Sequence, residues 1–241
     1  YTGDGSINSG PELTDSPLYN LIVENDGNLV VLSDVAVNDS LYVGSPIHTL
    51  ENTITINSPN DPIFNANNPK AEIHGRLRLT HLRLDSSKMI LHNPYTWAIF
   101  AKPEDANGAS ELLVEIKPNT MPKFLDTKKI RRTFSISAYD LNSNLINDGV
   151  DMVFNFGWHH MPGSEDDESE NLVLSNLTLQ RWDDVSQVWF NVPETGIPLE
   201  KENGWASNWA NLTTLGSFAI GPRGGEIVFN AKVFLEGPYR Y

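Results

Sequence analysis

An acidic run at residues 165–170 reads Glu-Asp-Asp-Glu-Ser-Glu and lies just after a Pro-Gly turn signal. Carboxylate oxygens are the hard ligands that Ca²⁺ prefers. The run lacks the Asp-x-Asp-x-Asp-Gly order and the terminal Glu of a calcium loop. We therefore predict a solvated acidic loop between two strands, with calcium binding as the alternative. The candidate ligands are Asp166, Asp167, Glu168 and Glu170.

Histidine is the other residue type in this chain that could bind a metal. His159 and His160 are neighbours, and neighbours on a strand point to opposite faces, so at most one of them can join a given site. No His-Glu-x-x-His spacing accompanies them, and we predict a structural or surface role. His74 and His81 could lie near each other on successive layers of strands.

Four aspartates could be tested for polysaccharide cleavage, since folds of stacked strands often display sugar sites along one face. The two hydrolytic mechanisms need paired carboxylates about 5 Å or about 6.5–9.5 Å apart. Turn formation is the preferred interpretation, because Asp commonly caps turns. Neither a Gly-x-Ser-x-Gly elbow nor a phosphate-binding glycine loop is present. The four residues are Asp34, Asp39, Asp61 and Asp85.

Tryptophan offers a further kind of site, because indole rings stack on sugars. Most of the six tryptophans are expected to pack in the core or between sheets. Trp205 and Trp209 lie in the loop-like segment Gly204-Trp205-Ala206-Ser207-Asn208-Trp209. They are the best candidates for glycan binding.

Composition limits the classes of partner. The 241 residues carry a formal net charge of −14, which would on average repel nucleic acid and anionic membranes. Hydrophobic content of 39% indicates a folded chain. The absence of cysteine excludes disulfides, thiolate zinc sites and a cysteine nucleophile. No apolar run approaches the roughly 20 residues of a transmembrane helix, so we expect neither a nucleic-acid partner nor membrane insertion.

Short alternating apolar segments dominate the first half of the chain, and Asn, Asp, Gly or Pro interrupts each one. They are too short for helices and recur closely enough to form stacked rungs. We predict an all-β chain with less than about 10% helix and a solenoid-like stacked segment over residues 1–125. Examples are Leu21-Ile22-Val23, Leu29-Val30-Val31-Leu32, Val35-Ala36-Val37, Leu41-Tyr42-Val43 and Ile54-Thr55-Ile56.

Longer, more aromatic strands follow near residue 130 and are typical of an antiparallel β-sandwich, which we assign to residues 126–241. Residues 181–189 are expected to form a hairpin with Trp182 and Trp189 on either side of its turn. Glu226–Leu235 is expected to be a final strand that completes a sheet in its own chain or in a neighbour.

Several sequence segments of this chain resemble segments of large surface proteins that the type IX secretion pathway exports. The resemblance rests on Asn28-Leu29-Val30-Val31 in the stacked segment and Asn155-Phe156-Gly157-Trp158 in the sandwich, and on Gly216-Ser217-Phe218-Ala219-Ile220-Gly221. It implies secretion and attachment to the cell surface. Such proteins carry a sorting region, and the expected anchor is either cleaved or not included here. Asp39-Ser40-Leu41 matches the O-glycosylation pattern of that group, which makes Ser40 a candidate acceptor.

The combined interpretation is an extracellular, non-enzymatic structural or adhesive module of a secreted surface protein. Terminal rungs and sheet edges favour contacts with other copies or domains of the same assembly, and a filament subunit is included in this expectation. The alternative is a carbohydrate-binding module or a glycan-active enzyme, with glycans as partners. We expect no cofactor, with calcium as the one candidate.

Overall fold

A computed structural model describes residues 2–3, 7–10, 13, 17–25, 27–120, 129–170 and 172–223. Within these ranges 53% of residues lie in strands and 5% in helices, which confirms the prediction of an all-β chain. The predicted final strand, Glu226–Leu235, lies outside the described residues.

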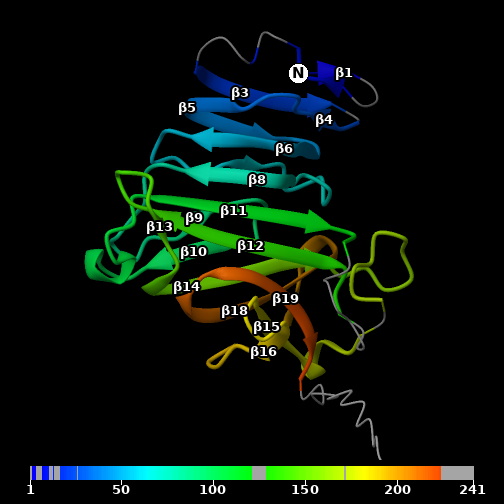
Figure 1. Ribbon diagram of the computed structural model, residues 1–241. Coiled ribbons are helices and arrows are strands. Elements are labelled where there is room, and N and C mark those ends of the chain that lie inside the picture. The colour runs from blue at the N-terminus through cyan, green and yellow to red at the C-terminus, as the bar shows by residue number, and fades with distance from the viewer. Residues whose placement is uncertain are drawn as a thin grey trace, which may run out of the picture.

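The N-terminal strands pair in parallel and stack as rungs, as the upper part of Figure 1 shows. Equivalent positions repeat from rung to rung, so that Leu29 pairs with Ile47 and Ile47 pairs with Ile73. This repetition confirms the solenoid-like segment. Its strands are β1 (Thr2–Gly3), β2 (Ile7–Asn8), β3 (Leu18–Asn25), β4 (Leu29–Val30), β5 (Val35–Val43), β6 (Ile47–Ile56), β7 (Ile63–Phe64) and β8 (Ile73–Leu79).

Polar side chains link neighbouring rungs, and we call three of these aspartates the solenoid corners: Asp34 and Asp61, which lie between strands, and Asp39 within β5. Asp34 Oδ1 accepts a hydrogen bond from the Thr53 backbone N–H at 2.8 Å. Asp39 accepts one from Asn60, and Asp61 forms an ion pair with Arg83. These contacts support the structural interpretation of the aspartates over a hydrolytic one.

The sheet continues beyond β8 with antiparallel strands, shown in green to orange in Figure 1. Two of them form the predicted hairpin, in which Trp182 pairs with Trp189 and their ring centroids lie 5.4 Å apart. These strands are β11 (Glu111–Pro118), β12 (Arg132–Tyr139), β13 (Leu145–Ile146), β15 (Leu177–Asp183), β16 (Val188–Asn191) and β19 (Gly216–Pro222).

A second, five-stranded sheet packs against these antiparallel strands and completes the predicted sandwich. Phe156 of this sheet contacts Phe134 and Phe218 of the first one, with ring centroids 5.0 and 5.5 Å away. Its strands are β9 (Met89–Ile90), β10 (Trp97–Phe100), β14 (Asp148–His159), β17 (Leu199–Lys201) and β18 (Trp205–Thr214). Short 3₁₀ helices are η2 (Pro103–Ala106), η3 (Leu174–Asn176) and η4 (Glu202–Gly204).

The predicted domain boundary after residue 125 falls between β11 and β12. These two strands pair along their length, from Glu111 with Tyr139 to Pro118 with Arg132. The main sheet therefore runs from the solenoid into the sandwich, and the division into two domains stays a prediction.

Candidate functional site

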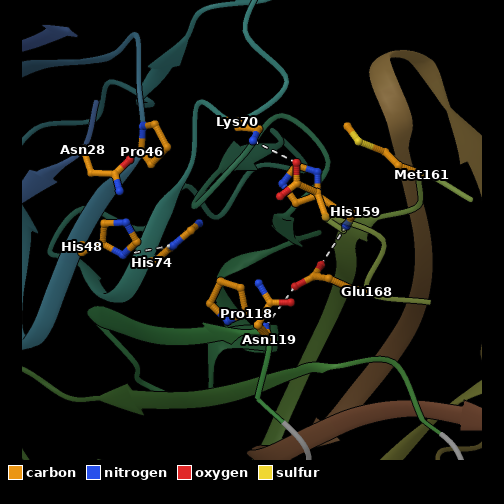
Figure 2. Close-up of a pocket in the computed structure, with 11 residues that line it drawn as sticks. Asn28, Pro46, His48, Lys70, His74, Pro118, Asn119, His159, Met161 and Glu168 are labelled. Carbon is orange, nitrogen blue, oxygen red and sulfur yellow. Dashed lines mark hydrogen bonds and ion pairs between the residues drawn. The ribbon is translucent and has the colours of Figure 1, made fainter. Parts of the chain in front are cut away.

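A pocket of about 210 Å³ opens where the solenoid meets the end of β14 and the loop that follows it. In Figure 2, His48 and His74 lie on one side of this pocket, and His159 and Met161 lie on the other. The lining residues are Asn28, Pro46, His48, Lys70, His74, Pro118, Asn119, His159, Met161, Asp166 and Glu168. Residues from both the solenoid and the sandwich thus line the pocket.

Three charged side chains adjoin the pocket, and we call Glu72, Arg132 and Glu168 the ion triad. Each has 1% or less of its surface exposed. Glu72 comes just before β8, Arg132 begins β12, and Glu168 lies in the loop after β14. The triad therefore joins the last rung of the solenoid to the sandwich.

Arg132 provides the positive charge for both carboxylates. Its Nη2 lies 2.9 Å from Glu72 Oε2, its Nη1 bonds to Glu72 Oε1, and its Nε lies 2.8 Å from Glu168 Oε2. Asn93 Nδ2 donates to Glu72 Oε1 at 2.7 Å, and the His159 backbone N–H donates to Glu168 Oε2 at 2.8 Å. Hydrogen bonding at this density is what allows charges to remain buried.

The two carboxylates differ in their pKa. Burial acts to raise the pKa of Glu72, but the Arg132 charge and hydrogen bonds from His74 and Arg132 hold it well below its usual range. Burial and the neighbouring Glu72 charge raise the pKa of Glu168, against the opposing effect of Arg132. Burial lowers the pKa of Arg132, yet the two carboxylates raise it overall. Glu72 is accordingly the more firmly ionised carboxylate of the two.

Histidines extend this network into the pocket. His74 Nε2 lies 3.0 Å from Glu72 Oε2, and His74 Nδ1 lies 3.2 Å from His48 Nδ1. His159 Nε2 lies 3.7 Å from Glu72 Oε2, and its ring packs on Trp205 with centroids 4.0 Å apart. Burial lowers the pKa of His48 and of His159 to about 4 each. Both rings are therefore neutral at pH 7.

Gly75 lets β8 pass close to β6 beside these histidines. Its φ of +99° lies in a region that favours glycine, and a Cβ at this position would lie 2.1 Å from Thr49 Oγ1. The pairing of β6 with β8 shifts register just after His48 and His74. The glycine thus allows the close approach that keeps the two rings next to each other.

The acidic loop differs from its prediction. Asp167, Glu168 and Ser169 are buried, so the interpretation of a solvated loop is wrong for these residues. Arg132 neutralises Glu168, and Asp167 accepts hydrogen bonds from the Ser169 hydroxyl at 2.6 Å and the Met161 backbone N–H at 3.1 Å. These contacts replace the water that a solvated loop would bind.

The remaining calcium candidates bind to cationic side chains. Asp166 lies 2.9 Å from Lys70, and Glu170 lies 3.2 Å from Arg131. Over the described ranges, no three His, Cys, Asp or Glu side chains form a group that could hold a metal ion. Calcium binding by the loop stays a prediction without a ligand cluster to support it.

The structure separates the two adjacent histidines as expected from strand geometry. His159 contacts Glu72, whereas His160 Nδ1 lies 2.8 Å from the Ser169 hydroxyl. The predicted neighbours His74 and His81 do not meet as partners on successive rungs. His81 lies in the bend after β8, and the rung next to His74 instead presents His48.

The glycan candidates have different environments. Trp205 and Trp209 belong to strand β18, so the assignment of this segment to a loop is wrong. Trp205 is 2% exposed and packs beneath His159, which leaves no face for a sugar. Trp209 is 44% exposed and keeps the glycan prediction. Ser40 is half-buried within β5 and donates to Asp39, and its glycosylation stays a prediction.

Sequence reasoning did not identify Glu72, Arg132 or His48 as site residues. Arg132 did carry a signal, because it has the same parity as Phe134 and Ile136, which face the core of β12. A charge on the inward face of a strand indicates a buried partner. The sequence offers no comparable signal for Glu72.

The arrangement can hold charges and position two imidazole rings beside a small cavity. Every oxygen of Glu72 and Glu168 accepts at least one N–H donor, which suits a structural network. Within the described part of the chain, no helix is long and apolar enough to cross a membrane. Comparisons of this chain with protein-family models, with curated proteins and with solved structures found no match.

Proposed function

We propose that this chain is a non-enzymatic structural or adhesive module of a secreted surface protein, and that it binds other copies or domains of the same assembly. The observation that supports the proposal most is a row of apolar side chains on the outside of the solenoid. We call Ile22, Tyr42 and Ile63 the apolar ladder.

The apolar ladder crosses three consecutive rungs. Ile22 pairs with Tyr42, and Tyr42 pairs with Ile63. Ile22 is 52% exposed, Ile63 is 57% exposed, and Tyr42 is half-buried. The neighbours of these residues in β3 and β5 are buried in the core, so the ladder lies on the outer face of the solenoid. Contiguous exposed apolar surface of this kind is typical of protein-binding sites.

The ion triad supports a structural rather than a catalytic role. Arg132 and the surrounding N–H donors occupy the carboxylate oxygens of Glu72 and Glu168. A general acid or base must reach the proton that it transfers in a substrate. Glu72 is completely buried, so its charge serves the interior of the protein.

The cellular location in this proposal rests on the resemblance to surface proteins of the type IX pathway. A stacked β segment that leads into a sandwich suits an elongated module exposed outside the cell. The net charge of −14 keeps such a module soluble while its apolar ladder makes specific contacts.

Sedimentation velocity over a range of protein concentrations tests the proposal. We expect concentration-dependent association that Ile63→Lys abolishes, because a charge in the ladder would have to be desolvated in the contact. Val185→Lys is the matched control, since Val185 is 93% exposed at the β15–β16 hairpin. A wild-type chain that stays monomeric at all concentrations and binds no surface would contradict the proposal.

Glycan recognition is the second candidate, and Trp209 favours it. A Cβ at position 196 would lie 2.4 Å from Trp209 Nε1, so Gly196 lets the backbone lie against the indole ring and hold it. Trp209 is 44% exposed on β18 of the five-stranded sheet. Trp209→Ala should remove binding in a glycan screen if this candidate is correct, whereas Trp205→Ala would report only on packing. Cleavage of a polysaccharide by the purified wild-type chain would favour an enzyme instead.

A further inference from the structure

His48 and His74 form a matched pair on consecutive rungs. They are direct partners in the register of β6 and β8. Their ring centroids lie 4.6 Å apart at an interplanar angle of 84°, and the two Nδ1 atoms are 3.2 Å apart. Both rings line the pocket of about 210 Å³, and a dashed line in Figure 2 marks the contact between them. The pair is thus preformed beside a space large enough for several water molecules.

The position of the protons on His74 follows from its carboxylate partner. Glu72 Oε2 lies 3.0 Å from His74 Nε2, and two N–H groups of Arg132 hold the Glu72 carboxylate. A carboxylate paired with Arg132 accepts a hydrogen bond from Nε2–H, which leaves the lone pair of a neutral His74 on Nδ1. That lone pair points toward His48 Nδ1.

The separation of the two Nδ1 atoms fits shared coordination of a cation. Bonds of about 2.0–2.1 Å to a tetrahedral Zn²⁺ place two nitrogen ligands roughly 3.3 Å apart. The observed 3.2 Å needs little adjustment. In addition, a carboxylate that orients a metal-binding histidine through its other ring nitrogen is a recurrent feature of metal sites. Glu72 has that relation to His74 and is itself fixed by Arg132 and Asn93.

We propose that His48 and His74 bind one divalent transition cation, Zn²⁺ or Cu²⁺, through their Nδ1 atoms, with Glu72 orienting His74. Since no third ligating side chain of the described residues joins them, water in the pocket completes the coordination. Binding requires His48 to carry its proton on Nε2, so neutral rings release no proton overall. Imidazole ligands select these cations over Ca²⁺ and Mg²⁺, which prefer oxygen.

The proposal does not depend on the assembly function, since the pocket and the apolar ladder involve different residues.

Isothermal titration of the full chain without a histidine tag tests the site. We expect one Zn²⁺ per chain, and we expect His48→Ala and His74→Ala each to weaken binding at least about tenfold. His81→Ala is the matched control, because His81 is exposed and its Nδ1 lies 3.2 Å from the adjacent Thr80 hydroxyl, away from the pocket lining. This variant should bind as the wild type does, and Ca²⁺ should not compete.

Two spectroscopic measurements distinguish loss of the metal site from misfolding of a variant. Electron paramagnetic resonance of the Cu²⁺-loaded chain should show two nitrogen ligands, reduced to one in His48→Phe, which keeps an aromatic ring. In the unsubstituted chain, ¹⁵N chemical shifts should show the His48 proton move from Nδ1 to Nε2 when Zn²⁺ is added. Unchanged ¹⁵N shifts in excess Zn²⁺, or equal loss of affinity in His81→Ala, would overturn the proposal.

Discussion

Polar side chains stabilise two regions of this molecule, one in contact with water and the other buried. At the solenoid corners, Asp34 and Asp39 bond to the next rung while in contact with water. In the ion triad, Glu72 and Glu168 bond to Arg132 with almost no contact with water. A hydrogen bond in water adds little net free energy, whereas a buried charge that loses its partner costs much more. Each corner therefore contributes a small free energy to the register of the rungs. The triad, in contrast, holds the solenoid and the sandwich together as one unit.

Replacing Arg132, the positive charge that both carboxylates of the triad share, should have the largest effect on stability. Arg132→Met leaves two buried carboxylates without their partner, and we expect the free energy of unfolding to fall by about 3–5 kcal/mol. Urea denaturation measures this loss. Arg76→Met is the control, because Arg76 is partly exposed in its ion pairs with Glu51 and Glu115 and should cost less than about 1 kcal/mol.

A combined variant sharpens the same comparison. Glu72→Gln and Glu168→Gln added to Arg132→Met remove the stranded negative charges, so the triple variant should regain part of the lost stability. If Arg132→Met costs no more than Arg76→Met, the triad does not differ from a surface ion pair and the comparison fails.

Acid should cause the next largest loss of stability, because buried histidines lie near the triad. Burial lowers the pKa of His92 and of His159 from 6.5 to about 4. The unfolded chain therefore binds more protons between these values, and stability that is complete above pH 6.5 is lost as the pH falls toward 4. Each proton contributes a slope of about 1.4 kcal/mol per pH unit. The raised pKa of Glu168 works in the other direction and offsets part of this loss.

Urea denaturation at a series of pH values measures this dependence. His159→Phe should flatten the slope between pH 6.5 and 4, because the ring keeps its packing on Trp205 but no longer titrates. A wild-type stability that is constant across this window, or a slope that the variant leaves unchanged, would contradict the assigned role of burial.

A corner substitution should have a smaller effect. Asp34→Ala removes one exposed acceptor, and we expect a loss of about 0.5–1 kcal/mol. Hydrogen exchange should speed up at the Thr53 amide of the next rung, since that amide loses its partner. Asp85→Ala is the control, because Asp85 bonds within its own turn to Ser87 and should leave the neighbouring rung unchanged.

Calcium should have the smallest effect. The carboxylates of residues 166–170 already have partners within the protein, so adding Ca²⁺ to chelator-treated protein should leave the melting temperature unchanged. Thermal denaturation measures this. A clear rise in the melting temperature that disappears in the double variant Asp166→Asn and Asp167→Asn would show that the loop binds calcium after all.

Local patterns explain why so much of the fold could be predicted. Period-two alternation identifies strands, and short polar interruptions identify turns, so the solenoid and the Trp182–Trp189 hairpin follow from neighbouring residues. The site depends instead on contacts between distant positions. Glu72 and Arg132 are 60 positions apart, and Arg132 and Glu168 are 36 apart.

Burial at the site could not be predicted from strand parity alone. Glu72 alternates with Ile73, which indicates a solvent-facing side chain for an exposed sheet. Arg132 of β12 and Asn93 bond to Glu72, which is therefore buried despite this alternation. Trp205 illustrates the same difficulty. The segment predicted to be a loop is strand β18, in which Trp205 packs beneath His159.

Hydrogen exchange of Arg132→Met beside the wild-type chain tests most directly whether the triad joins the solenoid to the sandwich. The account predicts that amides of β8 in the solenoid and of β14 in the sandwich lose protection together, while Arg76→Met, which removes contacts of β8 itself, leaves β14 unchanged. It also predicts recovery on both sides in the triple variant. Faster exchange confined to the sandwich, with β6 and β8 as protected as in the wild type, would contradict it.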